Sequence, residues 1–230
     1  MSKHDSTPRR DGIGASVHRK EDFRFLTGRG RYTDDLLLPG QGYAAFVRSP
    51  HAHAEIRAID PSAALSWPGV IAVFTGEDLL RDGVGELELE FTPRNHDGRP
   101  MFVPPRRPLA VTRVRYVGEP VAVVIAATPM GARDAAETVE VAYEELPAVI
   151  DPARAVDEES PGIWSGAKHN VACEVRYGDR EAAQRAFSAA AHVVSLELVN
   201  NRLVGNPIEP RAAIAAFDPG AGTYTLYASH

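Results

Sequence analysis

The chain has 230 residues, of which 44% are hydrophobic and 24% are charged, a composition typical of a folded globular protein rather than a disordered one. Its formal net charge of −6 argues against a nucleic-acid-binding function, for which a basic surface is expected. The single cysteine, Cys173, excludes an intramolecular disulfide and fits a reducing compartment.

Residues 1–20 are polar and show no sustained periodicity, so we expect a loosely held N-terminal arm. The pair Arg9–Arg10 suggests a twin-arginine export signal, but no apolar segment follows it, and this interpretation fails. No apolar run in the sequence is long enough to cross a bilayer. We therefore expect a cytoplasmic protein without a membrane span.

The segment after the arm alternates predicted strands with short helical turns. Apolar patterns predict strands over residues 42–49, 54–60 and 69–75. A helical turn is expected after Pro61, and a short helix is expected from Gly76. Glycine, proline, asparagine and charged residues dominate between Leu80 and Pro108, which predicts a long loop. The basic group Arg106–Arg107 in this loop is interpreted as a solvated turn.

The stretch "VRYVGEPVAVVIAA" contains a predicted bend at Gly118–Pro120. Pro120 restricts the preceding residue to an extended conformation and starts a strand. Residues 121–126 are apolar at every position, which predicts a strand covered on both faces. Thr128 is expected to cap a helix that has Pro129 at its first position. The apolar stripe of this helix is predicted to comprise Ala132, Ala135, Ala136 and Val139.

A further strand is predicted at "VEVAYEEL", and strand, helix and strand in succession predict a crossover unit on a mixed sheet. Residues 151–162 are acidic and contain proline, and they make the best linker candidate. Asp179 is then expected to cap a helix, followed by a strand over residues 193–199. Two last strands, at "RAAIAAFD" and "GTYTLYAS", are predicted to form a hairpin through residues 219–222.

Few residues are candidates for catalysis or for binding a metal or cofactor. His51 and His53 would share one face of a strand, but two ligands do not make a metal site, and packing or loop hydrogen bonding is favoured. Cys173 is interpreted as a small buried or half-buried residue in a strand-like segment rather than a reactive thiol. The glycine pairs at residues 12–14 and 27–30 lack the strand–turn–helix context of a dinucleotide-binding loop.

Glu209 stands between Pro207 and Pro210, with Arg211 just behind it. The favoured interpretation is structural: the prolines stiffen the start of a strand, and the carboxylate accepts backbone N–H bonds. General acid–base catalysis by Glu209 is the alternative, but no partner base, nucleophile or metal ligand is visible nearby in the sequence. We therefore assign no catalytic, cofactor-binding or metal-ligating residue.

Six stretches in order resemble the molybdopterin-binding large subunit of the molybdenum hydroxylases, the family of xanthine dehydrogenase, aldehyde oxidase and carbon monoxide dehydrogenase. They include "FVRSPHAHAEIRAID", "VRYVGEPVAVVIA" and "NPIEPRAAIAAFD", and together they occupy residues 14–35, 46–60, 68–79, 114–126, 177–194 and 206–218. The resemblance implies an α+β (mixed α/β) fold. After the arm, an a/b hammerhead domain would span residues 21–150, a linker residues 151–175, and an incomplete start of the molybdopterin-binding domain residues 176–230.

The resemblance also implies an oxidoreductase that hydroxylates an aldehyde, an N-heterocycle or a similar small substrate with water-derived oxygen. Its cofactor would be molybdopterin cytosine dinucleotide or a related molybdenum cofactor, and its partners an iron–sulfur subunit and often an FAD subunit. Glu209 matches a family position that we interpret as structural support beside the pocket. His230 matches the position before a glutamine that approaches the molybdenum ligands, so the glycine-rich pterin loops and the catalytic glutamate would lie further downstream.

From this resemblance we expect the 230 residues by themselves to be inactive and to hold no molybdenum. The sequence would then be the N-terminal part of a large subunit. The alternative is a self-standing hammerhead module that serves binding or assembly without redox chemistry.

Overall fold

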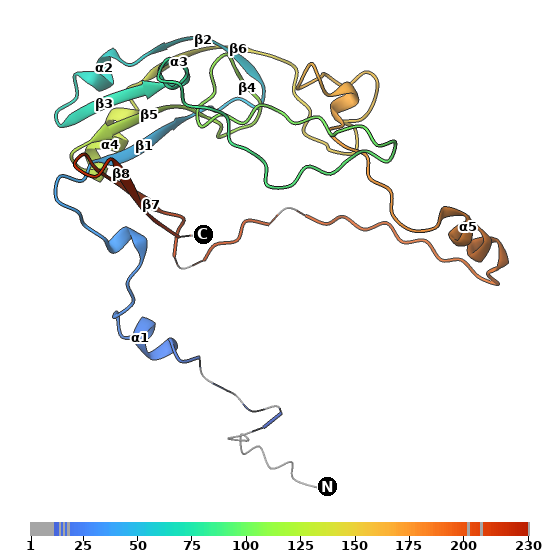
Figure 1. Ribbon diagram of the computed structural model, residues 1–230. Helices are drawn as coiled ribbons and strands as arrows, with labels where there is room; N and C mark the ends of the chain where they lie inside the picture. Colours follow the sequence, from blue (N-terminus) through green and yellow to red (C-terminus); the bar gives the residue numbers. More distant parts are fainter. Residues whose placement is uncertain are drawn as a thin grey trace, which may run out of the picture. The chain divides into compact units, whose positions relative to one another are not determined.

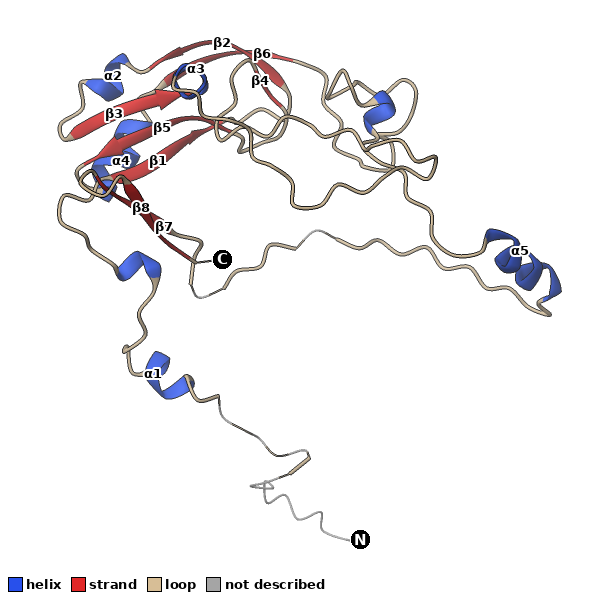
Figure 2. Ribbon diagram, viewed as in Figure 1, coloured by secondary structure: helices blue, strands red, loops and turns tan. Residues whose placement is uncertain are grey.

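The computed structural model describes residues 12, 13, 15, 17, 19–201, 203–207 and 209–229. By internal contacts the chain divides into two units, one of residues 40–195 and one that combines residues before Gly40 with residues from Leu196 onward. Helices and antiparallel sheets occur together (Figures 1 and 2), which confirms the predicted α+β fold class. Among the helices in this described part, none is long and apolar enough to span a membrane.

The first sheet of the 40–195 unit has β5 at its centre. Its strands, in spatial order, are β1 (Tyr43–Arg48), β5 (Pro120–Ala126) and β3 (Val70–Thr75). Both outer strands run antiparallel to β5, and Val123 pairs with Phe46 on one side and with Phe74 on the other. Val121 and Val124 point to opposite faces and are both fully buried, so β5 is covered on both faces, as its apolar run predicts.

The second sheet contains β4 (Arg113–Val114), β2 (Ala54–Asp60) and β6 (Glu140–Glu145), in that order. Every strand pair in the two sheets is antiparallel. The predicted crossover from β5 to β6 on one mixed sheet is therefore wrong, because these strands belong to different sheets. β6 alternates half-buried and exposed residues, which suits a sheet with one face in the core, and β5 already has a neighbour at each edge.

Three short helices accompany the sheets: α2 (Ser62–Leu65), α3 (Gly76–Arg81) and α4 (Pro129–Ala136). α4 begins as predicted, since Thr128 Oγ1 accepts a hydrogen bond from Gly131 N at 3.0 Å. Val139, the last member of the predicted apolar stripe, lies beyond the end of α4. The Val139 side chain is nevertheless buried against Ala64 and Val124. The half-buried Val47 packs against both buried clusters, and the two sheets thus share one core.

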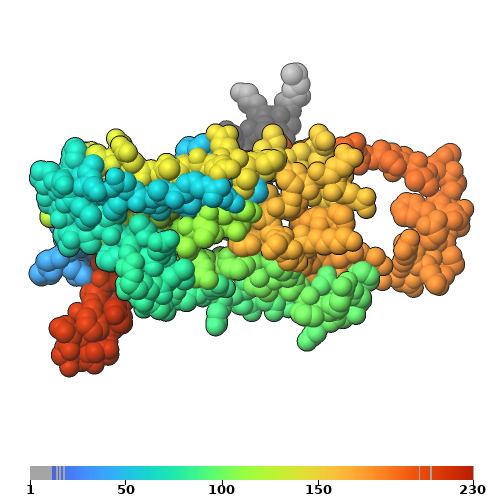
Figure 3. Space-filling view, turned by 90° about the horizontal axis from the view of Figure 1, so that it is seen from above, coloured from blue at the N-terminus to red at the C-terminus, as the bar shows by residue number. Residues whose placement is uncertain are grey.

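The long loop predicted between Leu80 and Pro108 has no strand or helix beyond α3, apart from an isolated bridge between Arg94 and Pro100. It is held by a distant segment: Phe102 N donates to Ala172 O and His96 N donates to Glu174 O, each at 2.8 Å. Figure 3 shows these green and orange segments side by side. The strand expected around Cys173 is absent from this described segment, because its few bonds go to an irregular loop and build no ladder.

Residues 151–162, the linker candidate, form turns without a helix or strand. The short 3-10 helix η2 (Lys168–Asn170) follows, and then α5 (Arg180–Ala189). Asp179 caps α5 as predicted, its Oδ1 accepting from Ala182 N at 2.9 Å. None of the α5 residues is buried, and the ring of Phe187 is largely exposed.

The second unit contains α1 (Asp22–Leu26), the 3-10 helix η1 (Thr33–Asp35), and the strands β7 (Ala213–Asp218) and β8 (Thr223–Ala228). β7 and β8 form the predicted hairpin, whose turn is closed by Asp218 Oδ1 accepting from Gly220 N at 2.8 Å. The strand predicted over residues 193–199 is wrong. Its β-branched residues favour extended backbone, but no described residue pairs with that segment, and Leu198 is 79% exposed.

Candidate functional site

Glu209 lies in the segment that leads into β7. Its Oε1 accepts a hydrogen bond from the backbone N–H of Thr33, the first residue of η1, at 3.2 Å. The prediction that this carboxylate accepts a backbone N–H bond is confirmed. Arg211 is exposed. Within the described ranges no group of three or more His, Cys, Asp or Glu side chains is placed to hold a metal ion, so Glu209 belongs to no such group there.

Ser229 closes the open end of the β7–β8 hairpin beside Glu209. Its Oγ donates to Pro210 O and accepts from Ala212 N, both at 2.9 Å, while its N–H donates to Ala212 O at 3.0 Å. These bonds join the end of β8 to the residues just before β7. His230, which the sequence comparison with the family singles out, lies outside the described residues.

His51 and His53 lie in the segment between β1 and β2, not on one strand face. His53 is buried, and its Nδ1 is 2.7 Å from Pro147 O, so that nitrogen carries the proton and donates. His51 Nδ1 lies 3.3 Å from Glu145 Oε1, and its ring packs edge-on against Tyr143 at 4.9 Å between centroids. These contacts agree with the favoured interpretation of packing and loop hydrogen bonding for both rings.

A serine, a histidine and a carboxylate thus stand near one another, but they do not form a nucleophilic triad. Ser49 is 2% exposed, and its Oγ donates to the His51 backbone O at 3.1 Å and accepts from the His51 backbone N at 3.0 Å. These bonds close a turn and occupy the hydroxyl with backbone groups. A triad would need the hydroxyl to bond the imidazole ring instead.

The bend at Gly118–Pro120 has the geometry that the sequence suggested. Gly118 has a φ of +90°, and its N–H donates to Ser49 O at 2.8 Å. Ser49 N in turn donates to Glu119 O at 3.0 Å, so the bend is joined to the end of β1. β5 then begins at Pro120.

A charged group at this bend was not predicted from the sequence. Glu119 Oε2 accepts from Arg115 N at 2.5 Å, and burial raises the pKa of Glu119. The Arg115 guanidinium lies 3.6 Å from the centroid of the Trp164 ring, and burial lowers its pKa. Trp164 is far away in the sequence, and no local pattern pairs it with Arg115. The group joins the sheet to the segment after the acidic linker, and no substrate-facing role follows from its contacts.

The contacts of the remaining candidates from the sequence are also of a structural kind. Cys173 is half-buried, with Sγ 3.9 Å from Pro93 O, in agreement with the interpretation of a partly buried residue. Arg107 Nη2 pairs with Glu86 Oε1 at 2.9 Å, at one side of the long loop. Gly28 has a φ of +69° in the turn after α1, which is not a dinucleotide-binding frame. Gly14 lies outside the described residues.

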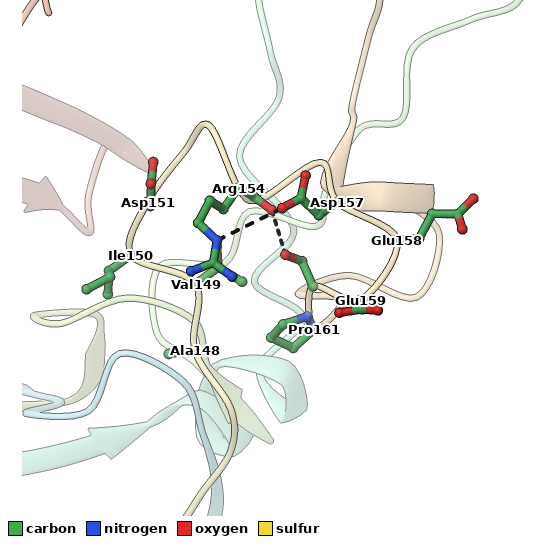
Figure 4. Close-up of a pocket in the computed structure, with 10 residues that line it drawn as sticks. Ala148, Val149, Ile150, Asp151, Arg154, Asp157, Glu158, Glu159 and Pro161 are labelled. Atoms are coloured by element: carbon green, nitrogen blue, oxygen red, sulfur yellow. Dashed lines mark hydrogen bonds and ion pairs between the residues drawn. The ribbon is translucent and has the colours of Figure 1, made fainter.

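The acidic linker and residues 148–150 just before it line a partly open pocket of about 600 Å³ (Figure 4). Its carboxylates are those of Asp151, Asp157, Glu158 and Glu159, and its single cation is Arg154. Arg154 Nε lies 4.0 Å from Asp157 Oδ2, while Figure 4 shows Glu158 pointing away from the other side chains. The whole pocket comes from one loop, and its excess of negative charge opposes a phosphate-bearing ligand.

Comparison with family models places two known domains on the chain. The a/b hammerhead domain of aldehyde oxidase and xanthine dehydrogenase matches residues 27–147. The molybdopterin cofactor-binding domain matches residues 163–230. The two matches follow one another in the order that the sequence resemblance implied, and the first covers the two antiparallel sheets of the 40–195 unit.

Curated relatives resemble the chain over nearly its whole length. The gamma subunit of the 6-hydroxypseudooxynicotine dehydrogenase complex of Paenarthrobacter nicotinovorans is 38% identical, covering 97% of this chain and 28% of the relative. The carbon monoxide dehydrogenase large chain of Afipia carboxidovorans is 35% identical, covering 94% and 27%. The chain therefore spans about a quarter of the length of these relatives.

Solved structures of oxidoreductases are also similar to this chain. Quinoline 2-oxidoreductase from Pseudomonas putida 86 is similar with a TM-score of 0.76 and 35% identity, covering 94% of this chain and 26% of that structure. The Cu,Mo-CO dehydrogenase is similar with a TM-score of 0.74 and 33% identity, covering 94% and 27%.

Proposed function

Because the chain belongs to the aldehyde oxidase and xanthine dehydrogenase family of molybdenum hydroxylase large subunits, we propose that it serves as the N-terminal part of such a subunit. The complete enzyme would be an oxidoreductase that hydroxylates an aldehyde, an N-heterocycle or a similar small substrate with water-derived oxygen. The observation that carries this proposal is the succession of two family domains, in the family's order, on a chain 38% identical to one such relative.

The proposed division follows the sequence: an arm over residues 1–20, the hammerhead domain over 21–150, a linker over 151–175, and the first elements of the molybdopterin-binding domain over 176–230. The matched ranges 27–147 and 163–230 support the order of the two domains, and the second match begins within the proposed linker. Residues 172–174 nevertheless hydrogen-bond to the long loop of the hammerhead region. The linker would therefore be fastened at its far end rather than freely extended.

Neither the linker pocket nor Glu209 fits a molybdopterin dinucleotide. Such a cofactor needs N–H donors and cations for its phosphates, but the linker pocket gathers carboxylates, and the Glu209 carboxylate is already bonded to Thr33. We therefore assign no catalytic, cofactor-binding or metal-ligating residue among the described residues and derive no catalytic step through the group. Molybdopterin cytosine dinucleotide or a related cofactor would be held by other residues of a large subunit, and the 230 residues alone would be inactive.

The proposed partners are an iron–sulfur subunit and, as in many members, an FAD subunit, in a cytoplasmic complex. Support comes from relatives described as a gamma subunit and as a large chain, which are names for components of larger assemblies.

A chimera tests the proposal. The matching quarter of the nicotine 6-hydroxylase large subunit, which is 39% identical to this chain, is replaced by the 230 residues and expressed with the relative's own partner subunits. Molybdenum content, measured by elemental analysis, should be restored close to the level of a control in which the relative's own segment is rejoined at the same junction. A soluble chimera without molybdenum, beside a loaded control, would contradict the proposal.

A self-standing hammerhead module without redox chemistry is the second candidate. It is favoured by the 40–195 unit, which has two sheets around one core of its own. Under this alternative, the isolated chain should be uniformly protected from hydrogen exchange through to β8. Under the main proposal, residues from 196 onward should be much less protected than β5.

A further inference from the structure

The hydrogen bond between Thr33 N and Glu209 Oε1 joins the two stretches of the second unit, which are 176 residues apart in the sequence. η1, which begins at Thr33, also packs against β7. Both residues are half-buried, so water competes only partly for this bond. A hydrogen bond from a backbone N–H to a carboxylate is charge-assisted and stronger than one between neutral groups.

The N–H of Thr33 needs an acceptor from outside its own helical turn. The first N–H groups of a helix have no partner within it. Asp35 Oδ2 accepts from Tyr32 N at 2.9 Å, which satisfies one donor at this end of η1. Glu209 supplies the acceptor for the next donor, so η1 is capped by a residue at the other end of the chain.

Glu209 stands between two prolines. Pro207 and Pro210 have restricted φ angles and lack an N–H, so neither residue can donate a backbone hydrogen bond to a strand ladder. The Pro210 carbonyl accepts from Ser229 Oγ at 2.9 Å. The Glu209 side chain therefore bonds to η1, and the Pro210 backbone carbonyl bonds to Ser229 at the end of β8.

We propose that Glu209 is a positioning residue at the centre of a clamp formed by Thr33, Glu209, Pro210 and Ser229. The clamp holds the start of β7 and the end of β8 against η1, and so fixes the place of the residues at the open end of the hairpin. The inference stands apart from the proposed function, because no cofactor or substrate enters it. It gives the glutamate a role other than proton transfer.

Hydrogen exchange of the full chain, resolved at the Thr33 amide, tests the clamp. Glu209→Ala should accelerate exchange of this amide by about tenfold, because a bond to a charged acceptor is lost. Glu209→Gln keeps an oxygen acceptor and should give an intermediate rate. Glu197→Ala, which removes an exposed carboxylate from the same unit, is the matched control and should change nothing. Unchanged exchange in Glu209→Ala, or equal acceleration in Glu209→Ala and Glu209→Gln, would overturn the clamp.

The donor side gives an independent test should Glu209→Ala fail to fold. Thr33→Pro removes the N–H, and Tyr32, with φ −101° and ψ 165°, already has a conformation suited to the residue before a proline. Thr33→Ala keeps the N–H and is the control. The reporter is the Leu36 amide, which donates to Thr33 O at 3.1 Å. Thr33→Pro should accelerate its exchange and Thr33→Ala should not; equal rates in the two variants would overturn the clamp.

Discussion

Replacing Gly118 should destabilise the 40–195 unit through the backbone alone. Gly118 has a φ of +90°, and a Cβ built on it meets no atom within 4 Å, so no steric clash with a neighbour contributes. A positive φ costs a residue with a Cβ about 1–2 kcal/mol of conformational free energy, and a β-branched residue lies at the upper end of this range. We therefore expect losses of about 1 kcal/mol for Gly118→Ala and about 2 kcal/mol for Gly118→Val. Pro120→Ala should cost less than about 1 kcal/mol, because it only loosens the start of β5.

Urea unfolding followed by tryptophan fluorescence measures these losses, because both tryptophans, Trp67 and Trp164, belong to this unit. Gly85→Ala and Gly85→Val are the matched controls: Gly85 also has open space around its Cβ position but no positive φ. The free energy of unfolding should change little in these controls. If Gly118→Val were no more destabilising than Gly85→Val, the backbone at this bend would not need glycine, and the reasoning would be refuted.

Three further outcomes are expected. Burial raises the pKa of Glu119 above its ordinary value, so the folded chain holds this proton more tightly than the unfolded chain, and stability falls as pH rises through the raised pKa. Glu119→Gln should remove that fall. In denaturant titrations, the free energy of unfolding of this variant minus that of the wild type should therefore be larger at neutral pH than at acidic pH. The same difference at both pH values would contradict this expectation. Gly76→Ala should destabilise the start of α3 in thermal melts, since its Cβ would lie 2.5 Å from Ala110 O, whereas Gly83→Ala, with open space at a positive φ, should show only the smaller backbone cost. In hydrogen exchange by mass spectrometry, amides of β7 and β8 should exchange much faster than those of β5, because β8 is exposed along its whole length; equal protection would speak for the self-standing module.

The caps and bends were predictable from the sequence because their chemistry is local. Thr128 before Pro129, Asp179 before its helix, and the glycine of the bend at Gly118 each act within a few residues, and the structure confirms all three. The β7–β8 hairpin was predictable for the same reason: two apolar strands flank a turn rich in glycine. The order of the six family stretches likewise indicated the family without any structure.

Only the tertiary structure decided which elements meet. It placed β6 beside β2 rather than in the sheet of β5, because strand pairing depends on free edges and buried faces that local patterns do not record. It left residues 193–199 without a ladder, since β propensity needs a pairing strand to form one. It also gave Glu209 its partner, because a carboxylate's acceptor role is settled by whichever N–H reaches it, and Thr33 lies at the opposite end of the chain.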